Sequence, residues 1–573
     1  MSRSVGILGT GPARAAIESA LVDVDIEKRS IAPDAVDDVD LTVVVGPAGT
    51  DPIHAVNRRA DRWIAVEIGG VGGVAVPEVD GAVTAFGPET GCYACLGTRV
   101  RSNLASEANV RPTAETADVR LLGAIAGRTA VAVLAGEPDV LGTVTELPHA
   151  QRELLPVPGC GCDSGSSLNR DPVKTTADRS LDAVATAMER AVDPRVGIVR
   201  EIGETDSFPA PYYLATLCDT TGFSDVRVPD QAAGVAADWD RAFVKAAGEA
   251  LERYAGGLYR EADFRTAPAA TLGNAVPPSA FVRPDEGYAP PDPDEAIPWV
   301  RGSSLTTGDP VSLPAEFVVF PPPTERHRPA ITTGLGLGSS GVEALLAGLY
   351  EVVERDATML AWYSTFEPMS LETDDAVVTT LRKRARAEDL SLDLALLTQD
   401  VDIPVVAAAV HRDGDWPQFG AGSAASLDPD RAARSAVSEA LQNWMELRAM
   451  GPDRAAEQEG WIGRYGTRPG AAREFITAET AVHVDALRPD SIPTGGDELA
   501  AVLERLTAVD LDAYASRLTT RDLADLGFEA SRVLVPAAQP LFVDQRYFGD
   551  RARTVPRSLG YRPRLDREPH PFP

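Results

Sequence analysis

The feature that most constrains this chain is a pair of near-identical segments, GEALERYA at 248–255 and YEVVERDA at 350–357. As helices, both segments place two glutamates three residues apart on one face. Such glutamates either face solvent in local ion pairs with arginine or converge on something positive. A single copy would favour the solvated face. Two copies favour convergence, so the fold is expected to bring two helices together at a polar centre.

Two longer helical patterns add to this centre. In VEALLAGLYEVVERDATMLAWY (342–363), Glu343, Glu351 and Glu354 lie within ~80° of arc on an otherwise apolar helix. In RAARSAVSEALQNWMELRAM (431–450), Glu439 and Gln442 are three residues apart. Magnesium takes hard oxygen ligands and commonly bridges carboxylates to nucleotide phosphates. The two near-identical motif copies, GEALERYA and YEVVERDA, therefore favour convergence on magnesium.

A glycine-rich run, GLGLGSSG at 334–341, precedes the second helix. Glycines let a backbone approach a ligand closely and expose its N–H groups. The run is not a Walker loop, because no Gly-Lys-Ser/Thr follows it. If ATP binds here, it binds in a different architecture.

Charge excludes several classes of function. The formal net charge of −31 argues against a nucleic-acid or anionic-membrane partner, since those surfaces require a basic protein. Only four basic residues are lysines, and the other 50 are arginines. Strong acidity with scarce lysine is typical of proteins from salt-loving archaea, although an acidic protein from a GC-rich genome is the alternative. No secretory signal or membrane-length apolar stretch appears, so we expect a soluble, cytoplasmic protein.

Residues 1–165 alternate predicted strands and helices, which indicates a doubly wound α/β domain with a parallel sheet. Gly9-x-Gly11 follows the first strand, but Arg14 replaces the third glycine of a dinucleotide fingerprint. The alternative interpretation, that the chain is a nicotinamide oxidoreductase, therefore depends on half of that motif. Residues 166–190 are interpreted as a linker, and residues 191–573 as an α+β domain.

Two cysteine pairs lie in the first part of the chain, Cys92 with Cys95 and Cys160 with Cys162. Four thiolates brought together by a fold can bind a tetrahedral structural zinc. The alternative is two unrelated pairs of reduced thiols.

Taken together, the two Glu-x-x-Glu-Arg helices, the glycine run and the later Glu-x-x-Gln helix resemble the YcaO superfamily. The resemblance implies an ATP- and magnesium-binding α+β YcaO domain. It implies that the following residues bind magnesium or order the nucleotide: Glu249, Glu252, Arg253, Ser339, Glu343, Glu351, Glu354, Arg355, Glu439 and Gln442. Magnesium itself is assigned to Glu249, Glu252, Glu351 and Glu354. Ser339 stands where the family often has asparagine.

The last residues, EPHPFP, end in PxPxP, as azoline-forming YcaO cyclodehydratases do. A proline-rich tail has a preset extended backbone and can thread a groove, although a frayed terminus is the common alternative. His570 and the carboxylate of Pro573 are candidates for a general base.

The segment GCYACLGTRVRSN at 91–103 resembles part of the ThiF-like domain, related to ubiquitin-activating enzymes, that is often fused ahead of YcaO and commonly carries a four-cysteine zinc site. Many such fusions begin with a leader-peptide clamp. Its absence here implies a separate leader-peptide-binding protein or a different recognition mode. A homodimer is usual for the family, and a flavin dehydrogenase is a further candidate partner.

The resemblance implies ATP-dependent cyclodehydration of Cys, Ser or Thr in a ribosomal precursor peptide, giving thiazoline or oxazoline. YcaO-type backbone thioamidation is the alternative within the superfamily. A non-catalytic scaffold that binds the precursor peptide is the alternative from another class. ATP consumption that depends on peptide separates the enzyme from the scaffold.

Overall fold

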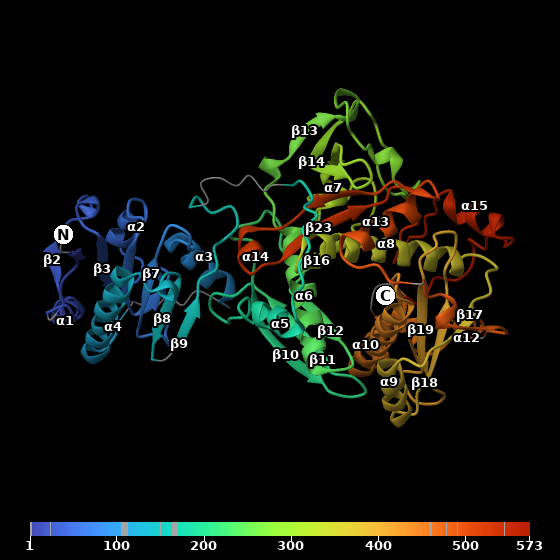
Figure 1. The fold of residues 1–573 in the computed structure, drawn as a ribbon, viewed down its shortest axis with the longest axis horizontal. Helices are drawn as coiled ribbons and strands as arrows, with labels where there is room; N and C mark the ends of the chain where they lie inside the picture. The colour runs from blue at the N-terminus through green and yellow to red at the C-terminus, as the bar shows by residue number, and fades with distance from the viewer. Residues whose placement is uncertain are drawn as a thin grey trace.

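The structure, a computed structural model, describes residues 3–572 except 23, 105–112, 149, 163–169, 458–460, 477, 490 and 544. It is elongated, with the N-terminal sheet at one end of the longest axis and the helices α8, α10 and α13 toward the other (Figure 1). None of the described helices is both long enough and apolar enough to cross a membrane.

The N-terminal region is built on a seven-stranded sheet in the order β2-β1-β3-β4-β7-β8-β9. The strands are β1 (Arg3–Leu8), β2 (Ile26–Ser30), β3 (Leu41–Pro47), β4 (Trp63–Ile68), β7 (Gly81–Phe86), β8 (Thr143–Leu147) and β9 (Ala150–Glu153). The first four pair in parallel, as expected. The prediction of a wholly parallel sheet is wrong, because β7, β8 and β9 pair antiparallel. Only the short strands β5 (Gly70–Val71) and β6 (Val74–Ala75) separate β4 from β7, whereas a parallel connection needs a crossover.

Helices cover both faces of this sheet and form two apolar cores. One core contains α1 (Pro12–Ala20) and α4 (Thr116–Ala135), and the other contains α2 (Asp51–Asn57) and α3 (Tyr93–Asn103). At the first turn, Gly9 and Gly11 have positive φ values of 101° and 96°. Arg14 donates a hydrogen bond to the Gly9 carbonyl at 3.1 Å, so the side chain that replaces the third glycine folds over the turn.

Beyond the N-terminal region, the described residues form three further sheets. The first is β10 (Val199–Asp206), β11 (Tyr212–Leu217) and β12 (Gln231–Val235). The second runs β13 (Arg265–Pro268), β14 (Ala296–Ser304), β22 (Tyr514–Arg517), β23 (Glu529–Leu534) and β16 (Leu335–Gly338), with β15 (Pro310–Pro314) paired to β14. The third runs β20 (Phe419–Ala425), β19 (Val405–His411), β18 (Ser391–Leu396), β17 (Met369–Glu372) and β21 (Ala481–His483).

Each sheet carries one long helix. Helix α6 (Trp239–Gly257) packs on β11 and β12, α8 (Gly341–Trp362) on β16 and β23, and α10 (Pro429–Ala456) on β19 and β20. These are the three helices on which the sequence places its carboxylates. Shorter helices are α5 (Leu181–Glu189), α7 (Ala315–Val318), α9 (Ala376–Ala387), α11 (Ile462–Tyr465), α12 (Gly470–Ile476), α13 (Gly496–Thr507), α14 (Arg521–Asp525) and α15 (Arg551–Ser558). Helix α5 lies inside the segment interpreted as a linker and packs against α6.

Candidate functional site

A cavity of about 840 Å³ lies where α6, α8 and α10 meet. Most of the site residues expected from the sequence line it. They are Glu249, Glu252 and Arg253 from α6, Glu351 and Arg355 from α8, and Glu439 and Gln442 from α10. Side chains more than 180 residues apart in sequence therefore line one cavity, in which carboxylates outnumber guanidinium groups.

Glycines let β16 lie directly against α8. A Cβ atom on Gly336 would come within 2.1 Å of the Ala344 carbonyl oxygen, so no larger residue fits. The Gly334 N–H donates to Glu351 Oε2 at 2.9 Å, which fixes that carboxylate. The Gly341 N–H donates to Thr175 Oγ1. The expectation that the run exposes its amides to a ligand is not met at these two amides, because protein oxygens occupy them.

Glu343 and Ser339, two further residues expected at the site, are not among the lining residues of this cavity. Glu343 is exposed and absent from the cavity wall. Its carboxylate accepts the Ser339 N–H at 2.8 Å, while Ser340 Oγ accepts the Glu343 N–H at 3.2 Å. This pattern is a variant of the capping box, in which the glutamate accepts the N–H of the residue before the N-cap Ser340. The structure therefore places Glu343 and Ser339 in the start of the helix and away from the cavity lining.

Arg355 lies among three carboxylates. Its guanidinium nitrogens are 3.4 Å from Glu354, 3.7 Å from Glu439 and 4.0 Å from Glu351. Burial opposes the charge of Arg355, but these carboxylates outweigh it and hold its pKa above the ordinary value. Glu354 itself is only 8% exposed and accepts a hydrogen bond from Ser423 Oγ at 2.7 Å. It is not part of the cavity lining, so it supports Arg355 from behind.

Burial raises the pKa of every glutamate that crowds this centre for which a shift is resolved. Burial, together with Glu351 and Glu249, raises the pKa of Glu252 to about 8. Burial raises the pKa of Glu354 to about 8 against the opposing effect of Arg355. The pKa values of Glu249 and Glu439 are also raised, mainly by burial. Carboxylates held together in this way favour a bound cation, because a cation relieves both their desolvation and their mutual repulsion.

The cavity also contains residues that the sequence analysis missed. They are Tyr212, Gln231, Asn443, Glu446 and Arg454. Glu446 accepts a hydrogen bond from Gln442 Nε2 at 3.0 Å, and burial raises its pKa. Its position four residues after Gln442 was a signal that helical spacing could have found. Tyr212 comes from β11, and no local pattern marks it.

Lys245 is another missed residue near the site. It lies one turn before Glu249 on α6. Burial lowers its pKa, and Glu439 and Glu249 act to raise it.

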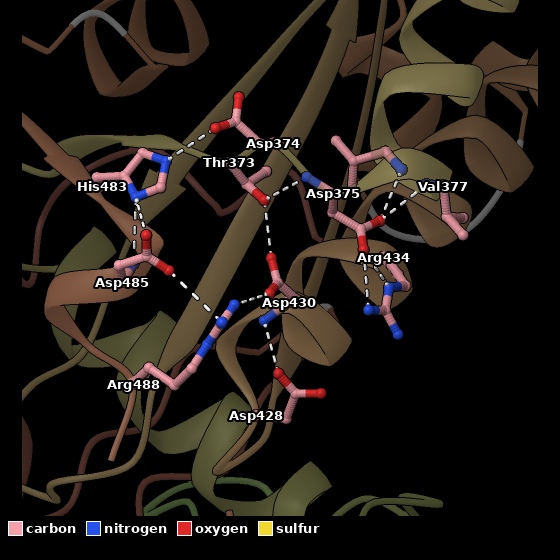
Figure 2. Close-up of polar contacts among 11 residues, drawn as sticks. Thr373, Asp374, Asp375, Val377, Asp428, Asp430, Arg434, His483, Asp485 and Arg488 are labelled. Carbon is pink, nitrogen blue, oxygen red and sulfur yellow. Dashed lines mark hydrogen bonds and ion pairs between the residues drawn. The ribbon is translucent and has the colours of Figure 1, made fainter. Parts of the chain in front are cut away.

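A polar cluster anchors the start of α10, which precedes the cavity residues of that helix in sequence (Figure 2). Thr373 Oγ1 donates to Asp430 Oδ1 at 2.7 Å, and Arg488 pairs with the same carboxylate. One turn further along α10, Arg434 pairs with Asp375 at 2.8 Å. These contacts join β17 and the chain after β21 to the helix that carries Glu439 and Gln442.

The proline-rich segment 568–572 is buried in the core. Trp362 Nε1 at the end of α8 donates to the Glu568 carbonyl at 2.8 Å, and Tyr465 donates to the Pro569 carbonyl. Phe572 is 3% exposed and belongs to the same apolar cluster as α8. The segment therefore braces α8. Pro573 lies outside the described residues.

His570 packs between Phe542 and Phe572 and is not a lining residue of the cavity. Its Nε2 lies 2.8 Å from the Phe542 carbonyl oxygen, so Nε2 donates and the lone pair is on Nδ1. Burial lowers the pKa of His570 to about 4, which keeps the ring neutral near pH 7. Among the described residues, Nδ1 has no hydrogen-bond partner.

The four cysteines meet in the N-terminal region. The Sγ atoms of Cys92 and Cys160 are 3.7 Å apart, those of Cys95 and Cys162 are 3.5 Å apart, and all four lie within 4.8 Å of one another. Tetrahedral zinc with bonds of about 2.3 Å places its sulfur ligands about 3.8 Å apart. The Val157 N–H donates to Cys95 Sγ at 3.3 Å, as expected around a thiolate ligand. The donor set and its spacing fit zinc.

The chain belongs to the YcaO family. The family model described as YcaO cyclodehydratase, ATP- and Mg2+-binding, matches residues 233–539, which include α6, α8 and α10. An uncharacterized protein of Methanothermobacter thermautotrophicus is 26% identical over 336 residues, covering 56% of this chain and 85% of that protein. An uncharacterized protein of Rhizobium leguminosarum bv. trifolii, from the tfuA 3' region, is 31% identical over 176 residues, covering 26% of this chain and 40% of that protein.

Two solved structures share the fold over almost the whole chain. A heterocyclase in complex with substrate and cofactor aligns with a TM-score of 0.73 and 19% identity, covering 97% of this chain and 83% of that one. The heterocyclase TruD aligns with a TM-score of 0.68 and 19% identity, covering 98% and 82%. Both alignments extend over the N-terminal sheet as well as the family region.

Proposed function

We propose that the protein is a YcaO-type, ATP-dependent peptide cyclodehydratase that converts Cys, Ser or Thr of a ribosomally made precursor peptide into thiazoline or oxazoline. The observation that carries this proposal is the convergence of α6, α8 and α10 on one acidic cavity in a chain of the ATP- and Mg2+-binding family. The fold shared with two heterocyclases supports it.

In this proposal the cavity binds magnesium and ATP. Glu249, Glu252 and Glu351 are the magnesium ligands, since their carboxylates line the cavity together. Magnesium, when bound, neutralises charge on the phosphates. Arg355 and Arg253 stabilise charge that develops on the transferring phosphoryl group. Gln442, held by Glu446, orients the nucleotide.

The reaction proceeds in three steps. The side-chain thiol or hydroxyl of the peptide attacks the preceding backbone carbonyl carbon and loses its proton to a base. The resulting oxyanion attacks the γ-phosphorus of ATP, and ADP leaves. Phosphate then departs with the former amide oxygen while the nitrogen loses its proton, which leaves a C=N double bond and a net loss of one water from the peptide. The carboxylates of the cavity wall are candidates for the base, and His570 and the carboxylate of Pro573 stay candidates from the sequence.

The proposal is tested with purified protein, Mg-ATP and candidate precursor peptides. We expect a mass loss of one water per ring and ADP formation that depends on peptide, and both should fall in Glu252→Gln at a magnesium concentration that just saturates the wild-type protein. The matched control is Glu343→Gln, because Glu343 caps α8 and does not line the cavity. Sulfur-for-oxygen exchange at a backbone amide, with added sulfide, would instead support the thioamidation alternative. Binding of peptide without ATP consumption would support the scaffold alternative.

We further propose that residues 1–165 are a ThiF-like domain with a structural zinc held by Cys92, Cys95, Cys160 and Cys162. The sulfur geometry supports zinc, and the shared fold with the heterocyclases supports a common N-terminal domain. Elemental analysis should find about one zinc per chain, which Cys92→Ser removes. A protein without bound metal would contradict the zinc assignment.

The remaining proposals concern setting and partners. A separate leader-peptide-binding protein, a flavin dehydrogenase and a homodimeric state are proposed from the family resemblance. The charge of −31 supports a halophilic, cytoplasmic setting, since salt screens self-repulsion. The melting temperature should therefore rise as potassium chloride is raised from 0.1 M toward about 1 M, and a constant or falling value would contradict the halophilic assignment.

A further inference from the structure

A buried charge network joins the N-terminal region to helix α6. Arg99 on α3, Asp522 on α14 and Tyr254 on α6 are each fully buried, although they lie hundreds of residues apart in sequence. Arg99 Nη2 pairs with Asp522 Oδ2 at 2.5 Å, and the Tyr254 hydroxyl donates to the same oxygen at 2.6 Å. The three groups therefore form one contact that joins α3, α14 and α6.

The network also reaches the cysteine cluster. Arg99 lies one turn after Cys95 on α3, and its Nη2 donates to the Pro156 carbonyl at 2.9 Å. The next residue, Val157, donates its N–H to Cys95 Sγ. Cys95, Leu155 and Val157 pack in the same apolar cluster as the buried face of α6. One packed unit is therefore formed by α3, the segment 155–157 and α6.

Helix α6 is the part of this unit that also lines the cavity. Tyr254 and Glu252 are two residues apart, so their side chains leave the helix on nearly opposite sides. Glu252 lines the cavity, while Tyr254 is anchored to Arg99 and Asp522. The contact on one side of α6 therefore sets the rotation and depth at which Glu249 and Glu252 enter the cavity on the other.

We propose that Arg99, acting through Asp522 and Tyr254, is a positioning residue that makes the N-terminal region part of the nucleotide site. Its buried charge is paired by Asp522 on α14, and the Tyr254 hydroxyl of α6 is hydrogen-bonded to both partners, so docking of α6 completes a contact that is costly to leave unmade. The inference rests on the proposed nucleotide site, and its consequence is a change in magnesium and nucleotide affinity with little change in turnover once the site is saturated.

The first test uses Tyr254→Phe, which removes one oxygen from the network and keeps the packing of the ring. The matched control is Tyr259→Phe, which removes a hydroxyl that donates to the Pro321 carbonyl at 2.9 Å in the same chain segment. Calorimetric titration of the magnesium-loaded protein with a non-hydrolysable ATP analogue should show a Kd about threefold higher in Tyr254→Phe and unchanged in Tyr259→Phe. Peptide-dependent turnover at saturating nucleotide should stay within about twofold of wild type in both.

The second test uses Arg99→Lys, which keeps the charge but cannot span Asp522, Tyr254 and Pro156 together. We expect a larger increase in the Kd of the analogue than in Tyr254→Phe, with the metal content of the cysteine cluster unchanged. Equal Kd values in wild type, Tyr254→Phe and Arg99→Lys would overturn the inference, as would an equal increase in the Tyr259→Phe control. Because the readout is nucleotide binding, absence of cyclodehydration would defeat the proposed reaction and leave this result standing. Failure of the wild-type protein to bind the analogue would defeat both.

Discussion

Helices α6 and α8 carry nearly the same five residues but use them differently. On α6, Glu249 and Glu252 both line the cavity, and Arg253 lies at the rim, where it pairs with Glu249 and donates to the Gln231 carbonyl. On α8, only Glu351 of the two glutamates lines the cavity.

The arginine of α8 is also placed differently. The Arg355 side chain is 13% exposed and lies among carboxylates from two helices, whereas that of Arg253 is 29% exposed and pairs within its own helix. Glu354 turns toward Ser423 on β20. The difference shows that one helical motif can supply ligands in one context and internal support in another, depending on what packs against the far side.

The largest expected effect comes from removing the arginine of α8, and the arginine of α6 is its matched comparison. Arg355→Met leaves three carboxylates without their shared cation, and we expect kcat/KM for peptide-dependent ATP consumption to fall by about 100-fold or more. Arg253→Met removes a partly exposed pair within one helix and should cost less than about tenfold. Steady-state kinetics measure both variants, and equal losses of kcat/KM would contradict the proposed difference between the two arginines.

Helix α8 has a support that α6 lacks, the segment 568–572. Removing residues 568–573 frees Trp362 and exposes the site of Phe572, so we expect turnover to fall by about tenfold or more. The Kd for nucleotide should change much less. Phe572→Leu, which keeps a smaller apolar side chain at this position and leaves the rest of the segment in place, is the control for partial loss of the core contact alone. Unchanged turnover in the shortened protein would contradict a role for this segment.

Glu252 and Glu354 occupy the same position in the two motifs, but replacing them should change the magnesium dependence of ATP consumption to different extents. Glu354→Gln keeps the contact to Ser423 but weakens the support of Arg355, and we expect the half-saturating magnesium concentration to rise by about tenfold. Glu252→Gln removes a proposed ligand and should raise it further. ATP consumption titrated with magnesium measures both, and a larger shift in Glu354→Gln would reverse the assignment.

The smallest effect is on pH dependence. The pKa values of Glu252 and Glu354 are about 8 in the folded protein, above those of an unfolded chain. The folded state therefore binds more protons between about pH 4.3 and pH 8, and the metal-free protein should lose stability as pH rises through that range. Magnesium should restore stability most near pH 8. Melting temperatures with and without magnesium test this, and Glu252→Gln should flatten the metal-free profile.

Much of the fold was open to prediction because its signals are local. The strand at Arg3–Leu8, the parallel strands β3 and β4 and the helix α4 follow from apolar runs and periodicity. The antiparallel turn at β7 was missed, since two short strands at 70–75 replace the expected helical crossover and leave little pattern. Helix α5 was missed within a segment rich in polar residues.

The site residues also divide into those with a local signal in the sequence and those without one. Helical spacing placed Glu249, Glu252 and Glu351 on faces that do line the cavity. Spacing also grouped Glu343 with them, because residues on one helix face look alike whether they cap the start or reach the centre. Glu446 was within reach of the same argument, whereas Tyr212 was not, because it enters from a separate sheet.

The sequence by itself determined which side chains are available and how they are grouped, since the repeated helical segments, the paired cysteines and the charge are all local properties of the chain. Only the tertiary structure decided which carboxylates face the cavity, which one supports Arg355, and that Arg99 meets Asp522 and Tyr254. Those outcomes depend on contacts between residues far apart in the chain. Burial and pairing, which set the charge state of each group, are properties of the packed molecule.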